Sequence, residues 1–163
     1  MFVRFEGEEM PCADQTEVFE VLLDEDERIA DLRLFKRTCG QAVGGAQLLA
    51  YLRGVSADEI LLQGLETWVP TIASLRLHEE FMLFKQFFSL RAALGVWSGQ
   101  RSGEPEQPFV LEELSYEEDG RCLIVGQIEV ALIHEEIRAC GGCRSCGTKQ
   151  PSSEEASMSH PPS

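Results

Sequence analysis

The fold is decided by residues 16–37, which read TEVFEVLLDEDERIADLRLFKR. Residues 16–23 are mostly apolar or β-branched, and residues 29–37 alternate between apolar and polar side chains. The acidic run at 24–27 breaks the two apolar stretches and is typical of a turn. The stretch therefore predicts two antiparallel strands joined by an acidic turn, and residues 2–5 are a candidate for a third strand.

The period of the sequence becomes helical after this hairpin. Apolar side chains at positions 43, 46, 49 and 50 share one face of a predicted helix that begins after Thr38-Cys39-Gly40 and ends at Gly54. Ser56 and Glu59 form a capping box for a second helix, and residues 76–94 predict a third that is apolar on more than one face and hence buried. We expect an α+β fold with helices packed on one face of a small antiparallel sheet of two to three strands.

Composition narrows the class of protein. The 28 acidic and 14 basic residues give a formal net charge of −14, which disfavours binding to nucleic acid. The sequence contains no run of about 18 apolar residues, so it predicts no membrane span. The first residues lack the basic and apolar regions of a signal peptide. We expect a cytoplasmic protein that binds neither nucleic acid nor membrane.

The domain organisation follows from residues 98–108, which read SGQRSGEPEQP and have the composition of a linker. Residues 1–97 are expected to form the first domain. Residues 109–150 are expected to form a short Cys-rich C-terminal appendage, with a helix near 129–138. Residues 151–163 are rich in Ser, Pro and Glu and predict a disordered tail.

Six cysteines are many for a chain in a reducing compartment, where closely spaced cysteines more often bind metal than form disulfides. Cys140, Cys143 and Cys146 are separated by two consecutive Cys-x-x-Cys spacings with glycines, which lets their sulfurs converge on one metal. Cys122 is the natural fourth ligand, and His134 is a weaker candidate. From these residues the bound group could be either zinc or an iron–sulfur cluster.

Other motifs occur in an order found in one known family. Pro11-Cys12-Ala13-Asp14 precedes the hairpin, and Phe35-Lys36 leads into Cys39-Gly40-Gln41-Ala42. A turn at residues 54–59 and Leu77-His78 follow in sequence. Over about residues 1–97 this order and spacing resemble the NifU/IscU-type iron–sulfur cluster assembly scaffolds.

The resemblance implies a SufE/NifU-like fold and a non-enzymatic scaffold or carrier that holds a labile iron–sulfur cluster, of the 2Fe–2S type. Cys12 and Cys39 would be ligands, Asp14 would keep the cluster labile, and His78 or Glu79 would complete the site. Thiolates suit iron–sulfur clusters, and the expected helix start at Cys39 would favour the thiolate. The implied partners are a cysteine desulfurase and acceptor apoproteins, and a homodimer is possible. Residues 122–146 resemble a shortened form of the 2Fe–2S module that follows this domain in full-length NifU proteins.

The chain departs from the family at several positions. Glu79 stands where the family has its third cysteine, and a carboxylate can ligate iron but cannot carry a persulfide. Ala13 replaces a glycine, and residues 73–77 read ASLRL in place of the chaperone-recognition stretch. Two alternatives stay open. One is a metal-binding adaptor of the same fold that has lost cluster assembly, with zinc or 2Fe–2S in its C-terminal cysteine group. The other is a sulfur transferase with Cys39 as persulfide nucleophile.

Overall fold

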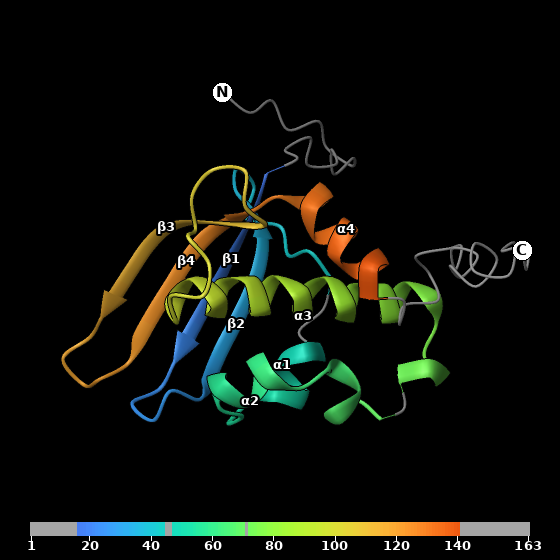
Figure 1. Cartoon of the computed structure of the whole chain (residues 1–163), viewed down its shortest axis with the longest axis horizontal. Coiled ribbons are helices and arrows are strands. Elements are labelled where there is room, and N and C mark those ends of the chain that lie inside the picture. Colours follow the sequence, from blue (N-terminus) through green and yellow to red (C-terminus); the bar gives the residue numbers. More distant parts are fainter. Residues whose placement is uncertain (1–15, 45–46, 71, 141–163) are drawn as a thin grey trace, which may run out of the picture.

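The computed structural model describes residues 16–44, 47–70 and 72–140. These residues form a four-stranded antiparallel sheet in the order β2-β1-β4-β3, with helices packed against it (Figure 1). In chain order the elements are β1 (Glu17–Leu23), β2 (Ile29–Lys36), α1 (Gln47–Leu52), α2 (Ala57–Leu62), two short 3-10 turns at Leu65–Thr67 and Ile72–Ser74, α3 (Leu77–Trp97), β3 (Phe109–Tyr116), β4 (Cys122–Ile128) and α4 (Val130–Cys140). The predicted α+β class is confirmed, but the expectation of two to three strands is too low.

The predicted hairpin is the first part of this sheet. β1 and β2 pair from Glu17 opposite Lys36 to Leu23 opposite Ile29. The acidic turn closes on itself because Asp24 Oδ1 accepts the backbone N–H groups of Asp26 and Arg28, at 2.9 and 3.0 Å. The acidic run therefore stops the strand and also supplies the acceptor that shapes the turn.

Residues beyond the expected linker complete the same sheet. β4 pairs antiparallel with β1 along its whole length, from Glu17 opposite Ile128 to Leu23 opposite Cys122. Gly126 allows close packing there, because a Cβ at this position would lie 2.3 Å from Phe109 Cζ. The predicted division at residues 98–108 therefore does not separate two packing units: residues 109–140 belong to the sheet and helices of the first.

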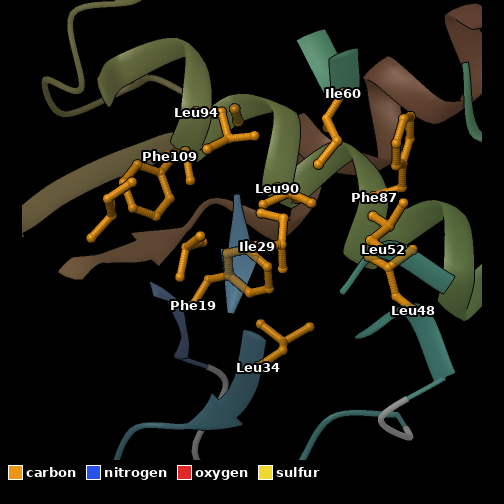
Figure 2. Close-up of a cluster of buried hydrophobic side chains, with 14 of the residues drawn as sticks. Phe19, Ile29, Leu34, Leu48, Leu52, Ile60, Phe87, Leu90, Leu94 and Phe109 are labelled. Carbon is orange, nitrogen blue, oxygen red and sulfur yellow. The ribbon is translucent and has the colours of Figure 1, made fainter. Parts of the chain in front are cut away.

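The core lies between the sheet and α3, which runs across one sheet face (Figure 1). The prediction of a buried helix at 76–94 is confirmed to within a few residues. Figure 2 shows side chains from the sheet packed with side chains of α1, α2 and α3. The labelled residues are Phe19, Ile29, Leu34, Leu48, Leu52, Ile60, Phe87, Leu90, Leu94 and Phe109. Each large apolar side chain buried in this way contributes about 1.5–3 kcal/mol.

The segment after Cys39 differs from the sequence prediction. Residues 40–44 form an irregular loop with an isolated bridge between Phe35 and Ala42, and α1 begins only at Gln47. Gly40 and Gly44 have φ angles of 68° and 74°, which are incompatible with a right-handed helix. The second predicted helix is confirmed as α2, and its capping box between Ser56 and Glu59 is complete.

The described helices include none that combines the length and the apolar character needed to cross a membrane.

Candidate functional site

The sheet topology brings four segments to one end of the molecule. Glu17 at the start of β1 lies opposite Lys36 at the end of β2 and opposite Ile128 at the end of β4. Phe109 at the start of β3 also lies opposite Ile128. Both hairpin turns are at the other end, so the loops that connect the sheet to the rest of the chain all meet at this end. We call it the open end of the sheet.

Cys39 lies at the open end, exposed in the turn that follows β2. Arg37 N–H donates to the carbonyl of Thr16 at 2.9 Å, and Gly40 N–H donates to the carbonyl of Lys36 at 2.8 Å. The first of these bonds ties the Cys39 turn to the residue from which β1 starts. Cys12 and Asp14 lie outside the described residues, but Cys12 precedes Thr16 by four positions, which span at most about 14 Å.

The environment of Cys39 corrects one expectation. No helix begins at this residue, because residues 40–44 form the glycine-containing loop described above. Cys39 is disulfide-bonded, and Cys122 is a free thiol.

His78 and Glu79 lie in the first turn of α3, His78 exposed and Glu79 half-buried. The loop at 40–44 packs on the same helix: Gln86 Nε2 donates to the carbonyl of Val43 at 3.2 Å. A Cβ at Gly44 would lie 2.7 Å from Met82 Cε, so this part of the loop touches α3 directly.

The spacing along α3 places these contacts on the same helix face as His78 and Glu79. Met82 follows His78 by four residues and Gln86 follows Glu79 by seven, and such positions share a face. The loop after Cys39 thus contacts the face of α3 that carries His78 and Glu79, and the contacts lie one to two helical turns after these two residues. Among the described residues, however, no three His, Cys, Asp or Glu side chains are grouped closely enough to hold a metal ion.

A small apolar pocket of about 160 Å³ lies between this loop and the sheet. Its lining includes Phe19, Leu34, Gly40, Val43 and Leu49. Residues 41–43 are tied to the edge of β2 beside this pocket, because Lys36 N–H donates to the carbonyl of Gln41 at 2.8 Å and Val43 N–H donates to the carbonyl of Leu34 at 2.9 Å.

Cys122, the predicted fourth ligand of the C-terminal group, is a core residue. It is 3% exposed, and burial raises the pKa of its thiol, which disfavours the thiolate that metals require. It begins β4, whereas α4 starts beyond the other end of that strand, roughly 20 Å away. The backbone of Cys140 ends α4, and Cys143 and Cys146 lie outside the described residues.

His134, the weaker candidate ligand, is directed at α3. Its ring makes an edge contact with Phe81 at a centroid distance of 5.1 Å. Its Nε2 is buried and has no hydrogen-bond partner among the described residues. Burial, helped by the charges of Lys85 and Arg138, lowers the pKa of His134 and keeps the imidazole neutral near pH 7.

The sequence analysis missed a buried ion pair at the open end. Lys85 Nζ lies 2.9 Å from Glu17 Oε1, and both side chains are less than a tenth exposed. The sequence does contain evidence for such a pair, because Lys85 stands among phenylalanines in a helix that was expected to be buried. A buried charge needs a partner of opposite charge. This pair forms part of a polar pocket between the sheet and α4.

No protein-family model, curated protein or solved structure matches this chain.

Proposed function

We propose that this protein is a non-enzymatic iron–sulfur cluster scaffold or carrier of the NifU/IscU type with a SufE/NifU-like fold. Cys12, Cys39 and Asp14, with His78 or Glu79, hold a labile cluster of the 2Fe–2S type. The observation that carries the proposal is the hydrogen bond from Arg37 N–H to the carbonyl of Thr16. It fixes the Cys39 turn beside the start of β1, which the Cys12–Asp14 motif immediately precedes.

The packing of the loop after Cys39 supports the same site. Its contacts with Met82 and Gln86 direct this loop to the α3 face of His78 and Glu79. An imidazole and a carboxylate can both ligate iron, and the Rieske centres show that histidines can replace two cysteines of a 2Fe–2S cluster. Glu79 thus gives the site a hard oxygen ligand in place of the third cysteine.

The disulfide at Cys39 has a direct chemical consequence. A sulfur in a disulfide cannot act as a thiolate ligand, so cluster binding requires reduction of this bond. We expect apo-protein isolated in air to be oxidised at this site and unable to take up iron until a reductant is added.

The proposal includes partners and a compartment. A cysteine desulfurase would supply sulfur, and acceptor apoproteins would receive the cluster in the cytoplasm. The net charge of −14 favours partners with basic surfaces. A homodimer would follow the family pattern.

The test is the iron and acid-labile sulfide content of protein purified without oxygen and with reductant, together with its visible spectrum. Wild type is compared with Cys12→Ser/Cys39→Ser, with Cys143→Ser/Cys146→Ser and with Cys122→Ala as a control for thiol loss in the core. A scaffold binds iron and sulfide in nearly equal amounts and loses both in the first variant alone.

The second candidate function is a metal-binding adaptor of the same fold, with zinc or a 2Fe–2S cluster held by Cys140, Cys143 and Cys146. Two observations favour it: Glu79 replaces the sulfur-accepting cysteine, and no helix N-terminus supports Cys39. In this case the Cys143→Ser/Cys146→Ser variant loses its metal, while Cys12→Ser/Cys39→Ser retains it. That result would end the scaffold proposal.

A further inference from the structure

The polar pocket at the open end of the sheet has a volume of about 520 Å³. Its lining consists of Thr16, Glu17, Lys36, Lys85 and residues 127–131. Glu17 stands between Lys36 and Ile128 in the strand register, and Lys85 reaches Glu17 from α3. A pocket of this size is in the usual range for small-ligand sites.

Glu17 contributes a buried acceptor that lacks a donor. Its Oε1 accepts a hydrogen bond from Lys85 Nζ at 2.9 Å, but its Oε2 has no partner among the described residues. The residue is only 5% exposed. Buried carboxylate oxygens are nearly always hydrogen-bonded, so an unpartnered one beside a pocket indicates a position for a ligand donor.

The start of α4 contributes donors that lack acceptors. Leu132 and Ile133 both donate to the carbonyl of Glu129, at 3.0 Å each. The preceding N–H groups, those of Val130 and Ala131, donate to no described residue, and both residues line the pocket. α4 has 11 residues, and the positive end of its dipole favours a negatively charged group at this position.

The described side chains that line the pocket carry both kinds of charge. Glu17 and Glu129 are negative, and Lys36 and Lys85 are positive. Gln127 Nε2 also donates to Glu129 Oε1 at 3.1 Å, which holds that carboxylate in place. A phosphate would meet two carboxylates here and a metal cation would meet two ammonium groups, whereas a zwitterion suits both kinds of charge.

We propose that this pocket binds a free α-amino acid. The carboxylate accepts hydrogen bonds from the N–H groups of Val130 and Ala131, and the ammonium group donates to Glu17 Oε2. This site uses neither cysteine nor iron, so it is independent of the proposed scaffold function.

The first experiment screens the twenty L-amino acids, each at about 10 mM, for a rise in the melting temperature of the full chain under reducing conditions. The best ligand is then titrated by calorimetry beside its decarboxylated amine and its deaminated carboxylic acid. We expect both halves to bind at least about tenfold more weakly, because each loses one charge-assisted contact. If no amino acid raises the melting temperature, or if one half binds as tightly as the whole, the proposal is overturned.

Variants at the first residue of α4 test the carboxylate contact without disturbing the buried pair. Val130→Pro removes one N–H at a helix position that tolerates proline, and Val130→Ala truncates the same side chain but keeps the N–H. We expect the dissociation constant to rise at least about fivefold for the proline variant and by less than about twofold for the alanine variant. Equal affinities in the two variants would overturn the assigned orientation. Retained binding in Cys12→Ser/Cys39→Ser separates this site from the scaffold site.

Discussion

Replacement of Lys85 by Met is the most direct test of how the open end of the sheet is held together. Methionine fills a similar volume in α3 but leaves Glu17 as a buried carboxylate with neither oxygen paired, because Oε2 already lacks a partner. Glu17 then keeps its charge in a position where the residue is only 5% exposed, with no counter-ion beside it. The expected result is a large loss of stability from one substitution.

The magnitude follows from the burial of the two side chains, which are 8% and 6% exposed. Breaking such a pair costs about 3–5 kcal/mol, out of a total free energy of unfolding of about 5–15 kcal/mol. With a urea m-value of about 2 kcal/mol/M, the unfolding midpoint should fall by about 1.5–2.5 M. The double variant Glu17→Leu/Lys85→Met removes both charges and should recover most of this loss, or exceed the stability of wild type by about 1–4 kcal/mol.

Urea unfolding followed by far-ultraviolet circular dichroism at pH 7, with reductant present, measures these differences. The matched control is Arg33→Met, which breaks the exposed pair between Arg33 and Glu20, where the N–O distance is 3.5 Å and the side chains are 60% and 30% exposed. That change should cost less than about 1 kcal/mol. The reasoning is refuted if Lys85→Met costs no more than the control, or if the double variant is as unstable as the sum of its single changes.

Three further predictions concern stability, each measured by urea unfolding. The pKa of His134 in the folded chain is lowered from 6.5, so below about pH 6.5 the unfolded chain binds a proton that the folded chain does not, and the free energy of unfolding should fall as the pH drops. His134→Gln should make the free energy of unfolding depend less on pH in this range, and an unchanged dependence would contradict the buried neutral imidazole. Gly44→Ala and Gly40→Ala should each cost about 1–3 kcal/mol, because both glycines have a positive φ and the flexible end of Met82 can move away from a Cβ at position 44; no loss in either variant would contradict the left-handed backbone. Ser56→Ala should cost about 1 kcal/mol and Ser56→Asp much less; equal losses would mean that the cap contributes little.

Local signals in the sequence predicted the elements whose causes are local. The acidic run at 24–27 both ended a strand and supplied turn acceptors, and the Ser56–Glu59 box needed only four adjacent residues. The helix at 76–94 could be recognised because it is apolar on several faces. The residues that start, stop or shape these elements are close together in the sequence, and only the burial of the helix requires residues from distant parts of the chain.

Elements that depend on distant partners were not predicted. The pairing of β4 with β1 joins residues about a hundred positions apart, and nothing local in Cys122–Ile128 specifies that neighbour. Residues 98–108 have the composition of a linker, yet Arg101 Nη1 reaches Glu136 Oε1 at 2.8 Å. Gly103 is buried, and a Cβ at this position would lie 2.8 Å from Val96 Cγ1 and 3.1 Å from Leu111 Cβ. Composition identified a loop correctly but could not show that the loop is packed.

In the candidate site, too, some features were predicted from local sequence and others were not. The family motifs placed Cys39 after a strand, which is confirmed, but the start of the following helix was misplaced because Gly40 and Gly44 adopt left-handed backbone angles. Those angles let residues 40–44 turn towards α3, and this turn is what brings the loop to the His78 and Glu79 face. The departure from the predicted helix therefore strengthens the spatial link between the predicted site residues.

Strand topology explains why both proposed sites lie at the same end. Two hairpins placed side by side, with β1 and β4 at the centre, put both tight turns at one end and all longer connections at the other. The turn end carries two short acidic loops and the buried Cys122. The open end receives the Cys39 turn, the start of β1 and the first turn of α4, so the exposed Cys39 and the N–H groups of Val130 and Ala131 lie there. Because Lys36 both ends β2 before the Cys39 turn and lines the polar pocket, the two sites are neighbours, and variants of one must be checked for effects on the other.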